Sequence, residues 1–333
     1  MAPSSIDSRQ KIEHTLTAGP STDKPSIYLL EAFPLEAVSY CQTQFNTVLS
    51  TDAEIHNWHE NATSILVREL IISAEDIARA PKLRAIGKQG TGIDIIDQDA
   101  CVKRGIPIFN TPGVNAQSVA ELVLALTMSV ARQLRTISVN QALGKEVRKE
   151  HCCGTMINGK TIGVLGMGNI GTAVARIFRG AFNTPIYAYD PFAPAYTWSD
   201  IPHIRVLNFE EMLPHVDMLT LYVPLNAKTR GMISMPQFLA MKSTAILINV
   251  ARGGIVNEDD MVIALNKGLI YGAGLDCHEE EPPTLQRYKA LWETGRVIST
   301  PHIGATTAQT QVQTATEAID HVFKYLTTAR SVM

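Results

Sequence analysis

Three ionisable residues, Arg252, Glu281 and His302, each follow an apolar run by a few positions in this 333-residue sequence. The runs are residues 245–250, 272–276 and 297–300. If these runs are parallel strands, their carboxyl ends lie on one edge of a sheet, where ligands bind in open α/β folds. We therefore expect the three side chains to converge at that edge.

The three side-chain types suit reduction of a carbonyl by hydride from a nicotinamide. The pKa of a histidine lies near neutrality, so His302 can donate the proton that the developing alkoxide needs. An adjacent carboxylate, Glu281, would raise that pKa and orient the ring. The Arg252 guanidinium can polarise the carbonyl and bind a neighbouring carboxylate. Singly, each residue could be a surface charge or a loop residue, but their joint placement favours catalysis.

A glycine-rich turn provides the place for the nicotinamide cofactor. Gly166, Gly168 and Gly171 are spaced as GxGxxG, between the apolar run 162–165 and a predicted helix over 172–179. This strand-turn-helix context predicts a dinucleotide site, with the pyrophosphate at the helix N-terminus. The alternative is a glycine turn in a buried sheet. We assign the contacts to Gly166, Met167, Gly168, Asn169, Ile170 and Gly171.

An acidic residue about 20 positions past the glycines, Asp190, follows the predicted strand that contains Tyr187 and Tyr189. A carboxylate there accepts hydrogen bonds from a ribose diol and repels a 2′-phosphate. Pro191 and Phe192, which come next, bring no cation. We therefore predict NAD rather than NADP.

The composition excludes several classes of function. The chain is 45% hydrophobic and 18% charged, with a net charge of -3, so it offers no basic surface for nucleic acid. No apolar run reaches membrane-spanning length, and the N-terminus lacks the apolar region of a secretory signal. The five cysteines are scattered, with neither disulfide nor metal-ligand spacing. We expect a cytoplasmic protein with no membrane, nucleic-acid or metal partner.

Strand and helix patterns alternate from residue 26, after a loose leader over 1–25, and predict α/β folding with parallel sheets. Further strands are expected over 26–30, 64–67, 83–86, 106–109 and 218–223, and helices over 35–41, 74–80 and 308–325. A long helical segment runs from Gln117 to about Leu143 with a broad apolar stripe. It could bridge two domains, contact a partner subunit or lie in the core.

With these motifs in order, the chain resembles the NAD-dependent D-2-hydroxyacid dehydrogenases over about residues 26–325, and most of all the core of D-3-phosphoglycerate dehydrogenases. The matching segments are 90–94, 110–112, 118–122, the glycine turn, 249–256, 276–283 and 300–304. The resemblance implies an Arg-Glu-His catalytic set at Arg252, Glu281 and His302. It implies that backbone N–H groups of Thr91 and Gly92 hold the substrate carboxylate. It adds further cofactor contacts at Tyr222, Pro224, Val250, Ala251, Asp276 and His302.

The resemblance also implies the architecture: two doubly wound parallel-sheet domains, with a Rossmann cofactor domain (114–303) inserted into a flavodoxin-like substrate domain (26–113 and 304–333). It implies a homodimer through the helix from Gln117. No carboxy-terminal regulatory domain is expected, because the family pattern ends near Tyr325. The chain departs from the family at Asn169 (often Arg), Tyr222 (often His), His278 (often Phe or Tyr) and Asn257 (often Asp).

The substrate stays open at this stage. Lys88 stands where phosphoglycerate dehydrogenases often carry Arg, so it either binds a second anionic group of the substrate or is a solvated lysine. The expected function is an NAD-dependent D-2-hydroxyacid dehydrogenase or 2-keto acid reductase, with 3-phosphoglycerate as one possible substrate. The alternatives are a glyoxylate or hydroxypyruvate reductase of the same family, and a non-catalytic NAD-sensing protein of the corepressor type.

Overall fold

The computed structural model describes residues 24–328, which form two compact units. Unit 1 comprises 24–87, 96–108 and 319–328, and unit 2 comprises Lys88–Ile95 and Phe109–Ala318. The predicted leader lies outside the described residues except for its last two, and so do the last five residues of the predicted substrate domain. The assignment of one domain to substrate and the other to cofactor stays a prediction.

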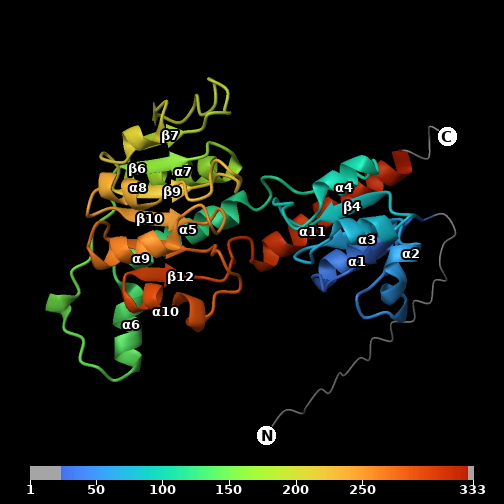
Figure 1. The fold of residues 1–333 in the computed structure, drawn as a ribbon, viewed down its shortest axis with the longest axis horizontal. Helices are drawn as coiled ribbons and strands as arrows, with labels where there is room; N and C mark the ends of the chain where they lie inside the picture. The colour runs from blue at the N-terminus through green and yellow to red at the C-terminus, as the bar shows by residue number, and fades with distance from the viewer. Residues whose placement is uncertain (1–23, 329–333) are drawn as a thin grey trace, which may run out of the picture. The chain divides into compact units, whose positions relative to one another are not determined.

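Unit 1, drawn mostly in blue and cyan in Figure 1, is built on a five-stranded sheet. Its strand order, β2-β1-β3-β4-β5, is the flavodoxin-like order. The strands are β1 (Ser26–Leu29), β2 (Asn46–Val48), β3 (Ser64–Val67), β4 (Ala85–Lys88) and β5 (Ile108–Phe109). Every residue of β3 is buried, as expected for a strand covered on both faces. Its helices are α1 (Leu35–Gln44), α2 (Trp58–Asn61), α3 (Ala74–Arg79), α4 (Gln98–Lys103) and the last part of α11 (Ala308–Thr328), with a 3₁₀ turn η1 (Ala53–Asn57).

Unit 2 contains a seven-stranded sheet in the order β12-β11-β10-β9-β6-β7-β8. This is the Rossmann order with one added strand. The chain adds β7 and β8 on one side of β6 and then β9 to β12 on its other side, so the order of strands switches between β6 and β9. The strands are β6 (Ile162–Leu165), β7 (Ile186–Tyr189), β8 (Ile204–Arg205), β9 (Met218–Leu221), β10 (Ile246–Asn249), β11 (Gly272–Leu275) and β12 (Val297–Ser299). The expected fold class of two doubly wound parallel sheets is confirmed.

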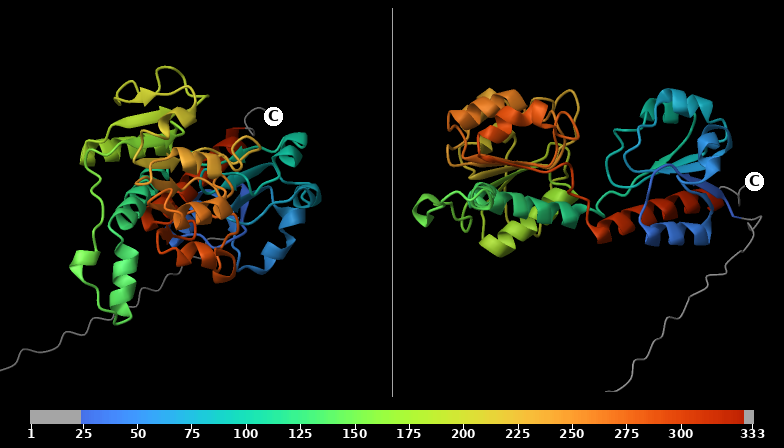
Figure 2. Two further views of the ribbon diagram at one scale, coloured as in Figure 1. Left: turned by 60° about the vertical axis from the view of Figure 1, so that its left-hand side comes forward. Right: turned by 90° about the horizontal axis from the view of Figure 1, so that it is seen from below.

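Helices cover both faces of the unit 2 sheet (Figure 2). One core cluster lies under α5 (Ala116–Ala131) and α7 (Asn169–Phe182), and includes Phe178. The other lies under α8 (Met235–Ala240), α9 (Glu258–Asn266) and α10 (Leu285–Glu293), and includes Phe238. Two short 3₁₀ turns, η2 (Lys149–His151) and η3 (Phe209–Met212), complete the unit. The carboxyl ends of the strands between these two helix layers carry the loops of the candidate site.

The prediction of a single long helix from Gln117 is wrong. The chain forms two helices, α5 and α6 (Leu134–Ala142), and the angle between them is 68°. The break occurs at Gln133, which has a left-handed φ of 54°. There the Ala131 carbonyl accepts a hydrogen bond from the Thr155 N–H at 2.8 Å, and the Gln133 side chain donates to the Tyr271 hydroxyl at 3.0 Å. These long-range partners end the helix without a glycine or proline to mark the position.

None of the described helices alone is long and apolar enough to cross a bilayer. The bent pair of α5 and α6 meets the length and composition criteria only when the two helices are taken together. The side chains of α5 are largely buried inside the protein.

Candidate active site

The loops that follow β10, β11 and β12 carry Arg252, Glu281 and His302 in turn. These three strands are neighbours in the sheet and run parallel, so their carboxyl ends lie on one edge. The glycine turn follows β6 on the same edge. The topology therefore brings the sequence-predicted residues of the second half of the chain to a common side of unit 2.

His302 and Glu281 form a hydrogen-bonded pair, with 2.9 Å between Nδ1 and Oε2. The second oxygen of Glu281 accepts the backbone N–H of His278 at 3.0 Å, which orients the carboxylate. Burial opposes ionisation of Glu281, but the hydrogen bonds from His302 and His278 outweigh it and lower the pKa of the carboxyl. Contacts with the Cys277 sulfur and with Glu281 raise the pKa of His302 above its usual value. Because burial keeps the Cys277 thiol neutral by raising its pKa, Glu281 is the charged partner that supports an imidazolium.

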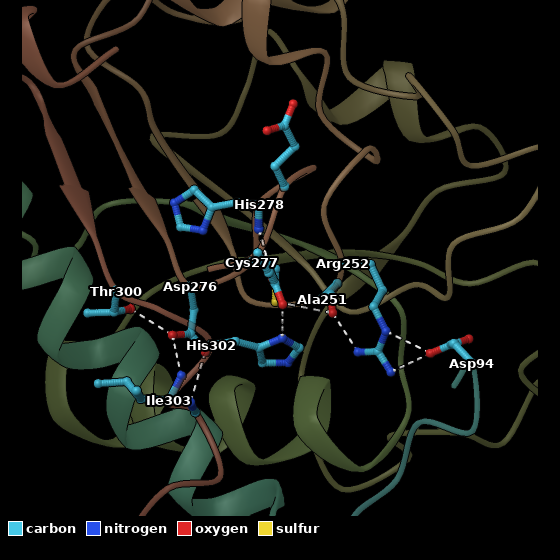
Figure 3. A network of polar contacts seen from close by, with 12 residues as sticks. Asp94, Ala251, Arg252, Asp276, Cys277, His278, Thr300, His302 and Ile303 are labelled. Atoms are coloured by element: carbon cyan, nitrogen blue, oxygen red, sulfur yellow. Dashed lines mark hydrogen bonds and ion pairs between the residues drawn. The ribbon is translucent and has the colours of Figure 1, made fainter. Parts of the chain in front are cut away.

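Asp276 holds the loop that carries His302 (Figure 3). Its carboxylate accepts hydrogen bonds from the N–H groups of Ile303 and Gly304, both at 2.8 Å, and from the Thr300 hydroxyl at 2.7 Å. Its backbone carbonyl accepts the N–H of His302 at 2.7 Å. His302 itself has a φ of 57°, a conformation that costs a non-glycine residue energy and persists only when neighbours impose it. Asp276 supplies that restraint.

Arg252 is fixed by three contacts, all inside unit 2. Nε and Nη2 each lie 2.9 Å from Oδ2 of Asp94, and Nη1 donates to the Ala251 carbonyl at 2.7 Å. The Asn249 side chain shapes the turn before it, since it donates to the Arg252 carbonyl at 2.9 Å and accepts the Ala251 N–H at 3.1 Å. The guanidinium is therefore oriented before any ligand arrives.

The segment 90–94 passes directly over Arg252. A Cβ on Gly92 would lie 1.9 Å from Nη2 of Arg252, so only glycine fits this approach. Among the residues that the structure describes, no acceptor takes the N–H of Thr91 or Gly92. Asn110 holds the segment by donating to the Thr91 carbonyl at 2.5 Å. Two free N–H donors and one guanidinium thus lie close together, which suits a carboxylate ligand.

The glycine turn has the geometry that a pyrophosphate needs. Gly166 has a φ of 101°, and a Cβ there would lie 2.8 Å from the Tyr222 carbonyl oxygen. A Cβ on Gly171 would lie 2.1 Å from the Gly166 carbonyl oxygen, so α7 packs on β6 with no space for a side chain. At Gly168, where α7 begins, a Cβ would meet nothing within 4 Å, so the backbone is open to a ligand. The chain therefore fits a dinucleotide at this turn.

Asp190 directly follows β7 and forms a hydrogen bond with the glycine turn. Its Oδ2 accepts the Met167 N–H at 2.9 Å, and its Oδ1 accepts the Phe192 N–H at 2.9 Å. Pro191 and Phe192 bring no cation, but Arg205 of β8 lies here, and its guanidinium donates to the Asp190 carbonyl at 2.9 Å. Arg205 also donates to the Pro194 carbonyl at 2.9 Å, so its donors are turned to the backbone. Its position on β8, 15 residues further along, hid it from the sequence pattern.

The other predicted cofactor contacts lie along the same edge, with differing surroundings. The Tyr222 hydroxyl bonds to Thr220 of β9, and burial raises its pKa. Val250 is buried in the core cluster beneath α5. The Pro224 carbonyl accepts from the Thr229 hydroxyl at 2.6 Å. Asn169 and Ile170 begin α7, and the Asn169 amide lies against Gly113.

His278, a departure from the family pattern, and Lys88, a candidate substrate contact, have distinct local settings. His278 is buried, bonds through Nε2 to the Ser299 hydroxyl at 2.7 Å and packs edge-on against Tyr288. Burial lowers its pKa, so it is a neutral ring filling the place of an aromatic residue. Lys88 ends β4 and donates to the Gln89 carbonyl at 2.7 Å.

Sequence reasoning missed Asp94 and Asn249, which orient Arg252, and Cys277, which lies against His302. Asp94 belongs to the Gly90–Asp94 motif, yet its partner is 158 residues away. Asn249 ends a strand next to Arg252, a place where side chains commonly bond the turn. Cys277 stands between two residues of interest, but nothing in the linear pattern points its sulfur at His302.

The sequence of this chain matches a known family and several known proteins. Residues 124–304 match the family described as D-isomer specific 2-hydroxyacid dehydrogenase, NAD binding domain. A hydroxypyruvate reductase of Thermotoga maritima is 37% identical over 263 residues, which are 79% of this chain and 84% of the relative. A D-3-phosphoglycerate dehydrogenase of Methanocaldococcus jannaschii is 36% identical over 255 residues. That match covers 77% of this chain and 48% of the relative, so the chain spans about half the length of that protein.

Among solved structures, a D-lactate dehydrogenase of Aquifex aeolicus, in complex with NAD and lactic acid, has a TM-score of 0.77 to this chain. The two are 25% identical, and the match covers 91% of this chain and 95% of that one. The comparison of folds therefore agrees with the family that residues 124–304 match in sequence.

Proposed function

Because the chain belongs to the D-isomer specific 2-hydroxyacid dehydrogenase family, with residues 124–304 in its NAD-binding domain, we propose that it interconverts a small 2-hydroxy acid and the 2-keto acid with NAD(H). The observation that carries this proposal is the His302–Glu281 pair, 2.9 Å apart, on the sheet edge that also bears the glycine turn. A histidine held by a carboxylate there is a proton donor next to a dinucleotide site.

When bound, NADH supplies the hydride that adds to C2 of the keto acid. His302 donates a proton to the oxygen that becomes the hydroxyl, and Glu281 stabilises the imidazolium before transfer. In the reverse direction the neutral imidazole accepts the proton from the hydroxyl. Asp276 keeps the ring in place by restraining the loop.

The substrate carboxylate is proposed to bind between Arg252 and the N–H groups of Thr91 and Gly92. Gly92 lies against Nη2 of Arg252, and Asp94 holds the guanidinium there. Arg252 also polarises the keto oxygen, which draws electron density from C2 and favours hydride addition. A carboxylate next to a carbonyl is the ligand that this arrangement recognises.

The proposed NAD contacts are Gly166 to Gly171, Asp190, Tyr222, Pro224, Val250, Ala251, Asp276 and His302. The carboxylate of Asp190 at the end of β7 supports NAD over NADP. Three hydrogen bonds already reach the Asp276 carboxylate from the loop that carries His302. Each carboxylate oxygen can accept two hydrogen bonds, so Oδ2 of Asp276 can accept one more, from the amide of a nicotinamide.

The experiment that tests the proposal measures NADH oxidation with glyoxylate, hydroxypyruvate, phenylpyruvate, oxaloacetate and 3-phosphohydroxypyruvate. Turnover that is lost in His302→Ala supports the proposal and ranks the substrates, including a hydroxypyruvate or phosphoglycerate preference. NADH binding without turnover of any of them would overturn it in favour of an NAD-sensing protein of the corepressor type.

We also propose a cytoplasmic homodimer. The five cysteines are all free in the structure, which supports the location because thiols stay reduced in the cytosol. The exposed apolar side chains of Leu134, Val139 and Leu143 on and after α6 support a contact with a second copy. Sedimentation equilibrium of the whole chain, compared with Leu143→Glu, tests this contact.

A further inference from the structure

The buried thiol of Cys277 lies next to His302, the proposed proton donor. Its sulfur donates a 3.4 Å hydrogen bond to the Ala251 carbonyl and contacts His302. One donor atom each from Cys277, Glu281 and His302 all lie within 4.8 Å of one another. Within residues 24–328, no other set of three such side chains comes this close.

We propose that Cys277, Glu281 and His302 form a zinc site that inhibits the enzyme. A thiolate and an imidazole select Zn²⁺ over hard ions such as Mg²⁺. Donor atoms on a tetrahedral zinc are separated by about 3.3–3.8 Å, given bond lengths of about 2.0–2.3 Å. Side-chain shifts of about 1 Å therefore convert the observed cluster into three corners of a tetrahedron.

The charges of the three groups match a divalent ion. A thiolate and a carboxylate carry two negative charges, which neutralise Zn²⁺ in a site where uncompensated charge is costly. The thiol proton and the Nδ1 proton pass to solvent when the metal binds. Cys277 is buried, but the side chains of His302 and Glu281 are 43% and 36% exposed, so an ion reaches the cluster from their side.

The consequence for catalysis rests on the proposed function. With zinc on Nδ1, His302 no longer donates to Glu281 and cannot carry two ring protons. The imidazolium that protonates the substrate oxygen is thereby lost. Zinc at this site therefore stops turnover without occupying the dinucleotide turn.

The direct test uses Co²⁺ as a spectroscopic probe on the reduced, full-length protein without NADH. We expect one Co²⁺ per chain with a near-ultraviolet cobalt–thiolate absorption band that Zn²⁺ removes and Mg²⁺ does not. The band is absent in Cys277→Val, with Cys277→Ala as a second variant should the first misfold. The double variant Cys152→Ser/Cys153→Ser is the matched control, because it removes the two more accessible thiols beside His151 and keeps the band.

A missing band in the wild type, or a band that survives in Cys277→Val, overturns the site. The kinetic arm measures zinc inhibition on whichever keto acid turns over, with reversal by EDTA. The inhibitory zinc concentration is expected to rise at least about tenfold in Cys277→Val. Absence of turnover with an intact band counts against the proposed function alone, whereas normal turnover without a band counts against the zinc site alone.

Discussion

The Arg252 guanidinium places two nitrogens, Nε and Nη2, at 2.9 Å from the same oxygen of Asp94. Both side chains remain partly exposed, so the ion pair contributes little to stability, about 0–1 kcal/mol. Its effect is geometric, because it fixes the guanidinium plane beneath Gly92. A residue from the first third of the chain thus orients the proposed carboxylate-binding group.

Replacing this anchor tests that role. Asp94→Asn keeps the size of the side chain and removes its charge, so Arg252 becomes mobile. We expect KM for the keto acid to rise about tenfold while the free energy of unfolding changes by less than about 1 kcal/mol. Asp99→Asn, an exposed site in α4 with the same charge change, is the control. Equal kinetics for the two variants would contradict a positioning role for Asp94.

The pH dependence of turnover follows from the raised pKa of His302. Reduction needs the protonated ring, so its rate is full below that raised pKa and falls as the pH rises through it. Oxidation shows the opposite limb. Glu281→Gln removes the negative charge that stabilises the imidazolium, so the falling limb of reduction moves to lower pH. The measurement is kcat/KM against pH for both proteins.

His302→Ala removes the proposed proton donor and gives the rate loss against which the effect of Glu281→Gln is compared. Loss of a general acid costs about 10²–10⁴-fold in rate, and we expect NADH affinity to stay nearly unchanged. A pH profile for Glu281→Gln that coincides with the wild type would show that the 2.9 Å pair does not set the titration.

Asp190 is expected to exclude NADPH. The wild type should prefer NADH by about tenfold or more in kcat/KM, which is a discrimination of about 1.4 kcal/mol. Asp190→Asn keeps an acceptor for the Met167 N–H and removes the charge, so the NADPH-to-NADH ratio rises. Asp200→Asn, an exposed carboxylate paired with Arg176, leaves the ratio unchanged. A wild type that favours NADPH would refute the assignment.

Lys88 is expected to discriminate among substrates. If its ammonium faces a second anionic group, Lys88→Ala raises KM for 3-phosphohydroxypyruvate or oxaloacetate by about tenfold more than for glyoxylate. Lys103→Ala, on the exposed face of α4, serves as the charge-matched control. Equal effects of Lys88→Ala on singly and doubly charged substrates would remove Lys88 from the substrate site.

Gly171 tests the packing of the glycine turn. The Cβ of Gly171→Ala would overlap the Gly166 carbonyl oxygen, which cannot yield because it is backbone. We expect a loss of about 1–3 kcal/mol in the free energy of unfolding and weaker NADH binding. Gly180→Ala on the same helix meets nothing within 4 Å and should be neutral or stabilising by up to about 1 kcal/mol. Denaturant titration and NADH fluorescence titration check both variants.

Local patterns were enough to place the elements of the site. The glycine spacing located the turn before α7, and the apolar runs located β10, β11 and β12 to within a residue or two. Parallel pairing then dictated that Arg252, Glu281 and His302 share a sheet edge, since a buried parallel strand is apolar throughout and its functional residues come after it. These features depend on residues close together in the chain, which is why sequence alone determines them.

Contacts between distant residues were decided only by the tertiary structure. The pairing of Asp94 with Arg252, the break of the long helix at Gln133 and the position of the Cys277 sulfur against His302 each depend on a partner from another element. No periodicity or spacing encodes such a pair, because each arises from how the strands and helices pack. The chemistry of this protein was therefore determined by its sequence, and the orientation and accessibility of the groups that perform it by its fold.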